Sequence, residues 1–247
     1  MGNNSLYDIV IGGRASKRKI LEIRVDELSG IEYFLQERGI KNLLHFTLLD
    51  NLMSILENGL IPVNEHDIYG IKSVTNDSNR FDARTECTSF SIGFPNYKLF
   101  YKFRKRVHPN KQWVILAINP EIILDPDRIV LFCSTNAAKQ LSKGFDEALF
   151  CKVDAFRKMY SDTGKNLNKE IVLREDLDIE RYMTTDPQAE LLVSDKIEVK
   201  YITNVYFDNK VVMNNLLNSI NIGEHLNIEF QLEHSLFRYR NDFTYWR

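Results

Sequence analysis

Cysteine is scarce in this sequence, and its spacing argues against metal and disulfide sites. Cys87, Cys133 and Cys151 include no CxxC pair, so we expect neither a structural zinc site nor a disulfide framework. Long apolar runs are missing too, since none reaches the roughly 18 residues that a membrane span requires. The short N-terminal apolar run follows no basic segment, which is atypical of a signal peptide. We therefore expect a cytoplasmic protein that makes no membrane contact.

A strong charge of one sign is also absent. The 247 residues carry a formal net charge of −2, so any nucleic-acid binding must come from local patches. The sequence contains no GxGxxG, GxxxxGKS/T, HExxH or GxSxG motif, which excludes several common enzyme classes. What is present is a large share of hydrophobic residues, 44%, which is enough to bury a sizeable core.

The hydrophobic patterns predict short strands and helices without a regular βαβ order. Strands are predicted at 6–11, 19–25, 42–47, 88–94, 112–120, 129–133 and 227–233, with two or three more within 190–207, and helices at 29–38, 48–58, 96–107, 136–156 and 210–219. This order favours an α+β fold with antiparallel sheets over a doubly wound fold. Residues 1–30 form a strand–turn–strand extension in this interpretation, and residues 31–247 form the main domain.

His45 and Thr47 lie where a predicted strand turns abruptly into a helix. Leu49, Leu52 and Leu56 mark one face of that helix. Backbone N–H groups at such a helix start can bind an anion or an amide carbonyl. A single histidine at a strand end is nevertheless more often structural than functional.

Three further segments carry chemistry, and each also has a structural interpretation. Arg80 and Arg84 lie in a polar loop before the strand at 88–94, where arginines are usually solvated. The stretch 96–106 interleaves lysine and arginine with aromatic residues, as an amphipathic helix also would. Glu190 begins a strand directly after a polar turn, where an acid commonly marks a solvated edge.

Taken together, these segments resemble the DarT family of DNA-base ADP-ribosyltransferase toxins. The resemblance rests on HFTLLDNLMSILENGL (45–60), RFDAR (80–84) followed by SFSIGFPNYKLFY (89–101), and TDPQAELLV (185–193). It covers about residues 41–207, and the tail RYRNDFTYW (238–246) fits it as well. It implies an ADP-ribosyltransferase-like core of two small, mostly antiparallel sheets around an NAD cleft, flanked by helices. NAD would be the ADP-ribose donor, and no metal would be needed.

The resemblance also implies roles for individual residues. A strand-end turn would hold the nicotinamide carboxamide, His45 would bond to a ribose hydroxyl, and an arginine would suit the pyrophosphate. Arg80 is favoured over Arg84 as the catalytic arginine. The implied cofactor-binding residues are His45, Phe46, Thr47, Asn51, Ser54, Arg80, Arg84, Ser89 and Ser91.

Glu190 is the expected catalytic carboxylate. Cleavage of the nicotinamide–ribose bond passes through an oxocarbenium-like state, which a nearby ionised carboxylate stabilises. The same carboxylate can remove a proton from a nucleobase nitrogen, which is otherwise a poor nucleophile. These two tasks explain an acid at the junction of turn and strand.

Single-stranded DNA is the expected acceptor, because bases are not accessible inside a duplex. The residues expected to contact it are Lys98, Lys102, Arg104, Lys105, Arg181, Tyr182 and Met183. The family resemblance further implies a role in a toxin–antitoxin or phage-defence pair. The cognate antitoxin would be an ADP-ribosyl hydrolase of the macrodomain or a similar type.

Other functions stay open at this point. The same fold could modify RNA or a protein side chain, and the chain could be a non-catalytic nucleic-acid-binding module. A metal-dependent nuclease would need clustered acids, and Asp176, Asp178 and Glu180 are close in sequence. A solvated acidic loop is the simpler interpretation of those three residues. The modified base, thymine or guanine, is not determined by the sequence.

Overall fold

The computed structural model describes residues 15–71, 84–141, 146–165, 171–219 and 227–246. Its first described element is the helix α1 (Lys17–Arg38), which begins after Ser16 and ends at Gly39. The side chain of Ser16 accepts a hydrogen bond from the N–H of Lys19, and Gly39 adopts a left-handed conformation with φ 67°. The C-terminal end of the helix predicted at 29–38 is therefore confirmed.

The strand predicted at 19–25 is wrong, because α1 already covers these residues. The buried side of α1 includes Ile20, Arg24 and Ile31. Since Arg24 interrupts the apolar spacing, the helical period is hidden in the sequence. The guanidinium of Arg24 is satisfied in part by the carbonyl oxygen of Ile123 at 2.6 Å. The other strand of the predicted extension, 6–11, lies outside the described residues, and a domain boundary at residue 30 stays a prediction.

The described strands form a seven-stranded sheet of order β4-β7-β2-β1-β3-β8-β9 and a separate pair β5-β6. All neighbours in the large sheet are antiparallel except β8 and β9, which are parallel. The strands are β1 (Leu43–Leu48), β2 (Cys87–Ile92), β3 (Trp113–Ile118), β4 (Val130–Cys133), β5 (Thr163–Lys165), β6 (Ile171–Val172), β7 (Glu190–Ser194), β8 (Ile202–Phe207) and β9 (Glu229–Leu232). The predicted α+β class is confirmed.

A weak junction divides the large sheet into two halves. β1 and β2 pair only through Leu43 with Ile92 and Leu44 with Ser91. β1 pairs along its whole length with β3 on its other side. The halves β4-β7-β2 and β1-β3-β8-β9 therefore separate beyond Leu44, which agrees with the predicted core of two small sheets.

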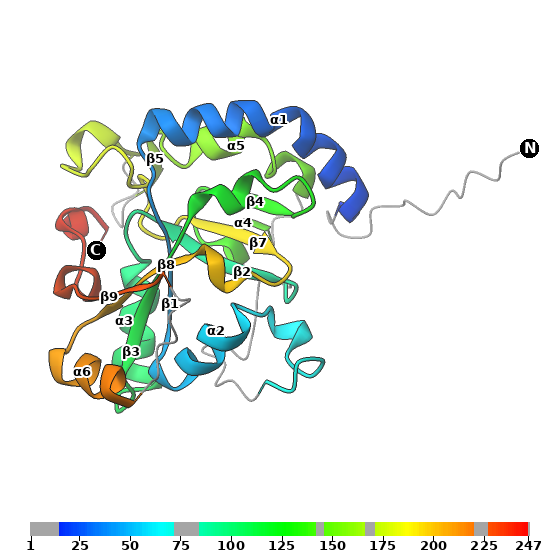
Figure 1. Cartoon of the computed structure of the whole chain (residues 1–247). Coiled ribbons are helices and arrows are strands. Elements are labelled where there is room, and N and C mark those ends of the chain that lie inside the picture. Colours follow the sequence, from blue (N-terminus) through cyan, green and yellow to red (C-terminus); the bar gives the residue numbers. More distant parts are fainter. Residues whose placement is uncertain (1–14, 72–83, 142–145, 166–170, 220–226, 247) are drawn as a thin grey trace, which may run out of the picture.

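The helices are α1, α2 (Leu52–Asn58), α3 (Tyr97–Lys102), α4 (Ala137–Leu141), α5 (Val153–Lys158) and α6 (Lys210–Ser219). In Figure 1, α1 and α5 lie side by side along the edge next to β4, whereas α2 lies near the opposite end of the molecule. One face of the sheet contributes apolar side chains to a core that also contains residues of α1, α2 and α5. On the other face, the β1-β3 half packs against Phe100, Phe103 and Phe237.

Two predicted helices are not continuous α-helices in the structure. The helix predicted at 96–107 consists of α3 and a following π-helix, Phe103–Val107. The helix predicted at 136–156 is interrupted, because α4 ends at Leu141 and α5 begins at Val153. Short 3-10 turns and irregular backbone in the second segment allow the carbonyl oxygen of Phe150 to accept a hydrogen bond from the N–H of the β4 residue Phe132.

Candidate active site

Glu190, the first residue of β7, is buried and surrounded by hydrogen-bond donors. The N–H of Ala137 donates to Oε2 at 2.7 Å. The side-chain amide of Asn136 lies 3.2 and 3.3 Å from the two carboxylate oxygens, and the amide of Asn96 reaches Oε1 at 3.5 Å. Such donors favour the ionised form of a carboxylate and fix its orientation.

His45 lies in β1 with its ring between Phe46 and Phe90. Its Nδ1 is 3.0 Å from the carbonyl oxygen of Ser89. Because a carbonyl oxygen can only accept, we assign the proton to Nδ1. On the next turn, the amide of Asn51 donates to the hydroxyl of Thr47 at 3.1 Å. The first contact links β1 to β2, and the second links the end of β1 to the turn that follows it.

Strand pairing brings Glu190 and His45 to the same region. Phe90 pairs with Leu191, and Leu44 pairs with Ser91, so Glu190, Ser91 and Leu44 follow one another across three adjacent strands. Neighbouring strands lie about 4.8 Å apart, which places the backbones of Glu190 and Leu44 roughly 10 Å from each other. Glu190 and the residue next to Leu44, His45, therefore flank the point where the two halves of the sheet separate.

The loop before β7 packs closely onto the end of β2. Gly93 has φ 75°, and a Cβ at this position would lie 2.6 Å from Cδ2 of Tyr182. The carbonyl oxygen of Tyr182 accepts a hydrogen bond from the hydroxyl of Tyr160 at 3.1 Å. Arg181 is exposed and donates to the carbonyl oxygen of Arg38 at 3.3 Å, whereas Met183 is half-buried. The loop thus holds its aromatic ring against the strand next to Glu190.

Asp186 is a buried carboxyl group in the same loop. Burial raises its pKa, although the N–H of Gln188 donates to Oδ1 at 2.7 Å and Lys98 and Arg240 act in the opposite direction. The hydroxyl of nearby Tyr97 is buried without a hydrogen-bond partner, and burial raises its pKa as well. Sequence reasoning did not single out Asp186 or Tyr97, since neither stands out from a polar turn or an aromatic helix.

Only one of the two candidate arginines lies in the described part of the chain. Arg80 lies outside the described residues. Arg84 is buried, and its guanidinium pairs with Glu147 and Glu86. Its Nε is 3.0 Å from Glu147, and its Nη1 is 2.8 Å from Glu86. Two carboxylates therefore balance the charge of Arg84, and its role in cofactor binding stays a prediction.

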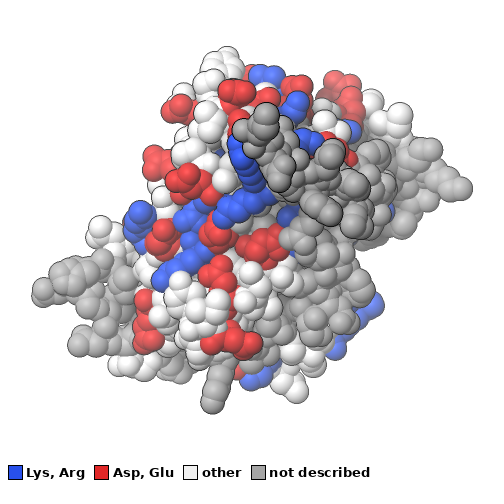
Figure 2. Space-filling view, turned by 90° about the vertical axis from the view of Figure 1, so that its right-hand side faces the viewer, with Lys and Arg blue, Asp and Glu red and all other residues white. Residues whose placement is uncertain are grey.

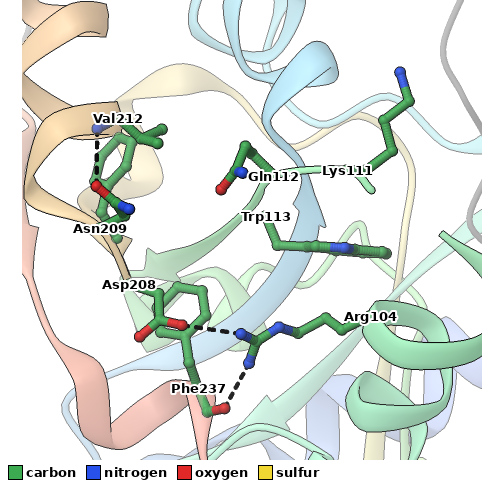
Figure 3. A pocket seen from close by; sticks show the side chains of 9 residues that line it. Arg104, Lys111, Gln112, Trp113, Asp208, Asn209, Val212 and Phe237 are labelled. Carbon is green, nitrogen blue, oxygen red and sulfur yellow. Dashed lines mark hydrogen bonds and ion pairs between the residues drawn. The ribbon is translucent and has the colours of Figure 1, made fainter. Parts of the chain in front are cut away.

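The basic residues after β2 have diverse surroundings. Lys98 is partly buried and donates to the backbone carbonyl of Trp246, and burial lowers its pKa. Arg104 donates to Asp208 at 2.9 Å and to the carbonyl oxygen of Phe237 at 2.5 Å, at the edge of a small pocket (Figure 3). Arg104 thus serves as a structural link between the π-helix and the C-terminal segment. Its role in nucleic-acid binding stays a prediction.

Lys102 and Lys105 are exposed and remain the better candidates for phosphate contacts in this segment. The face shown in Figure 2 interleaves Lys and Arg with Asp and Glu, so its described residues present no extended field of one sign. This agrees with the expectation that any nucleic-acid binding depends on local patches.

The serines predicted to bind the cofactor also take part in hydrogen bonds within the protein. The hydroxyl of Ser91 accepts a hydrogen bond from the N–H of Asn96 at 3.0 Å, which fixes the start of α3 beside Glu190. The carbonyl oxygen of Ser89 contacts His45, and the carbonyl oxygen of Ser54 accepts from Asn58 at 3.1 Å. Binding of a cofactor by Ser54, Ser89 or Ser91 stays a prediction.

Two asparagines at this site were missed in the sequence. Asn96 and Asn136 each precede a short helix, and both reach Glu190. An asparagine before a helical stretch is a recognisable capping signal. The sequence cannot show that both caps converge on one acid, because β7 comes more than 50 residues after Asn136.

Neither metal ligation nor membrane spanning has support in the described part of the chain. Among those residues, no group of three or more His, Cys, Asp or Glu side chains could hold a metal ion. No helix there combines the length and the apolar character that crossing a bilayer would require.

A split sheet with a histidine and an anchored carboxylate at the split is the arrangement expected for an ADP-ribosyltransferase. The family described as "ssDNA thymidine ADP-ribosyltransferase, DarT" matches residues 44–238. The chain belongs to this DarT family of NAD-dependent ADP-ribosyltransferases that act on DNA, and the predicted resemblance is confirmed.

Solved structures share the fold at low sequence identity. "Thermus sp. 2.9 DarT in complex with ADP-ribosylated ssDNA" is 12% identical with a TM-score of 0.55, and the match covers 81% of this chain and 97% of that one. "Thermosipho africanus DarTG in complex with ADP-ribose" is 20% identical with a TM-score of 0.51 and covers 80% of this chain. This chain spans only 51% of the Thermosipho chain. No curated protein matches significantly.

Proposed function

We propose that this protein transfers ADP-ribose from NAD to a thymine base of single-stranded DNA. The family description supports thymine over guanine, and the Thermus relative of the same fold was solved with ADP-ribosylated single-stranded DNA. The observation that carries the proposal is Glu190, a buried carboxylate anchored by Asn136 and Ala137 on β7, which β2 alone separates from the strand that bears His45. A protein that only binds nucleic acid has no use for such a carboxylate, because it repels phosphates.

In the proposed reaction, the bond between the ribose C1′ and the nicotinamide nitrogen breaks, and its electron pair leaves with nicotinamide. A nitrogen of the base forms the new bond to C1′, and the proton that it loses passes to the carboxylate of Glu190. The same carboxylate stabilises positive charge on the ribose while both bonds are long. One group can serve both tasks because the ribose and the base meet at C1′.

The remaining site residues take the positions that the sequence predicts. His45 and the turn after β1 bind the nicotinamide ribose and carboxamide, with Phe46, Thr47, Asn51 and Ser54 around them. Arg80 contacts the pyrophosphate. The assignment to Arg80 in preference to Arg84 is supported by the two ion pairs of Arg84, because they already balance its charge. Arg181, Tyr182 and Met183 present the acceptor base, and the half-exposed ring of Tyr182 is suited to stack on it.

The biological role follows from the resemblance to the family. A bulky ADP-ribose group on a template base would obstruct its copying, so we propose that the protein acts as the toxin of a toxin–antitoxin or phage-defence pair in the cytoplasm. Its partner would be an ADP-ribosyl hydrolase, of the macrodomain or a similar type, which removes the modification.

The test is incubation of the protein with NAD and short DNA oligonucleotides, each lacking one of the four bases. Mass spectrometry should show an ADP-ribose adduct on every oligonucleotide except the one without thymine. RNA of the same sequence and duplex DNA are the controls, and both should stay largely unmodified. Adducts on RNA alone, on protein alone, or on the oligonucleotide without thymine would overturn the proposed acceptor.

A further inference from the structure

The C-terminal segment Arg238–Trp246 returns to the loop that leads into Glu190. In Figure 1 this segment, drawn in red, lies at the left of the molecule next to β9. The guanidinium of Arg240 donates from Nη1 to the carbonyl oxygen of Thr184 and from Nη2 to that of Thr185, each at 2.7 Å. Arg240 and both threonines are buried. Two consecutive backbone carbonyls are therefore held by one rigid side chain.

Arg240 is itself fixed by a buried acid. Its Nε and Nη2 contact the two carboxylate oxygens of Asp242 at 2.7 and 2.6 Å. The indole N–H of Trp246 donates to the same carboxylate at 2.8 Å. Paired in this way, the guanidinium has a single orientation, and its remaining donors point at the loop. The charge is also balanced, which a buried arginine requires.

A second arginine binds the loop from the other side. Arg174 donates to the hydroxyl of Thr185 at 3.0 Å and to the carbonyl oxygens of Glu180 and Arg181 at 3.3 and 3.2 Å. The N–H of Thr185 donates to the carbonyl oxygen of Met159 at 2.9 Å. The backbone at 184–185 is thus fixed, while residues 181–183 ahead of it remain exposed or half-buried.

We propose that Arg240 is a positioning residue for the acceptor base. By fixing Thr184 and Thr185, it sets where residues 181–183 stand relative to Glu190. This inference rests on the proposed function, in which that loop presents the base. The family match ends at residue 238, so the match does not assign this role to Arg240.

The hydrogen bonds of Arg240 involve the acceptor loop and Asp242, not the groups that anchor Glu190. The hydrogen bonds to Glu190 come from Asn136, Ala137 and Asn96. Loss of Arg240 should therefore displace the acceptor loop and leave the donor side in place. Because small misplacements of reacting groups have large effects on rate, transfer should suffer much more than NAD affinity.

The experiment compares Arg240→Met with Arg238→Met, a matched change of an exposed arginine two residues earlier. Three quantities are measured: kcat/KM for a thymine-containing oligonucleotide, the Kd for NAD, and the melting temperature. For Arg240→Met we expect kcat/KM to fall at least about tenfold and the Kd for NAD to stay within about twofold. Arg238→Met should match the wild type in all three.

Unchanged kcat/KM in a folded Arg240→Met variant would overturn the inference. So would an equal loss of NAD affinity and transfer, since that pattern indicates a general structural defect. If Arg240→Met does not fold, Asp242→Asn tests the same idea by releasing the guanidinium, and unchanged kcat/KM there is equally decisive. A wild-type protein that transfers nothing to DNA would instead refute the proposed function, so the two failures are distinguishable.

Discussion

The backbone N–H of Ala137 lies 2.7 Å from the carboxylate of Glu190, so the first residue of α4 fixes the acid that begins β7. Asn136, one residue earlier, bonds to both oxygens of the same carboxylate. A carboxylate held in this way needs little reorganisation when charge develops nearby, which is the property that electrostatic catalysis requires.

Replacing Glu190 by glutamine should abolish transfer and preserve NAD binding. The amide keeps the size of the side chain but cannot carry the charge or accept the proton. We expect kcat to fall by about 100-fold or more, with the Kd for NAD within about threefold of the wild type. Labelled NAD and an oligonucleotide measure the first quantity, and titration calorimetry measures the second. Glu32→Gln, at an exposed position of α1, is the control. Near-normal transfer by Glu190→Gln would refute its proposed role.

Arg80 and Arg84 should respond to mutation in opposite ways. Arg84→Met leaves Glu147 buried without its arginine, so the free energy of unfolding should fall by about 3–5 kcal/mol. Arg80→Met should lower transfer by about 100-fold, as expected for the loss of a pyrophosphate contact. A stable Arg84→Met variant that fails to bind NAD would reverse the assignment.

Gly93→Ala tests the contact between β2 and the acceptor loop. The added Cβ would lie 2.6 Å from the ring of Tyr182, so the ring must shift from its position. Gly70→Ala is a matched control, because Gly70 also has a positive φ, 63°, but no atom lies within 4 Å of its Cβ position. Both variants should lose about 1 kcal/mol of stability from backbone strain. Only Gly93→Ala should lower kcat/KM for DNA, and equal activity of the two variants would contradict the proposed loop role.

Asp186 should make stability depend on pH in one direction. Burial raises its pKa in the folded state, so the folded protein binds more protons than the unfolded chain just above pH 3.8. The contribution of Asp186 to stability therefore falls as the pH rises from this value through the raised pKa. Asp186→Asn removes that dependence. The melting temperature of the variant should therefore rise relative to that of the wild type as the pH increases from 4 to 7. The control is Asp127→Asn at an exposed position, which should show no such gain.

Lys102 and Lys105 should set part of the salt dependence of DNA binding. Each phosphate contact on a single strand contributes about −0.7 to the slope of log K against log salt concentration. A double change to glutamine should therefore make the slope shallower by about 1.4. Fluorescence anisotropy at several salt concentrations gives the slope. Changing Lys41 and Lys200, exposed lysines outside this segment, should leave it unaltered.

Local patterns in the sequence determined many of the elements. Alternating and continuous apolar runs predicted β1, β2, β3, β4 and β7, and Gly39 and Gly59 marked the helix ends. The order of the motifs around His45 and Glu190 sufficed to predict the family. Each of these signals depends on a residue and its near neighbours, which is why a single sequence reveals it.

Only the tertiary structure decided what surrounds those residues. Arg24 on the buried side of α1, the pairing of Arg84 with Glu147, and the anchoring of Glu190 by Asn136 each join positions far apart in the chain. Arg240, which binds a loop 55 residues earlier, is the clearest case. Such contacts follow from strand order and helix packing. The sequence alone does not show whether a charged residue is exposed to solvent or buried against a partner.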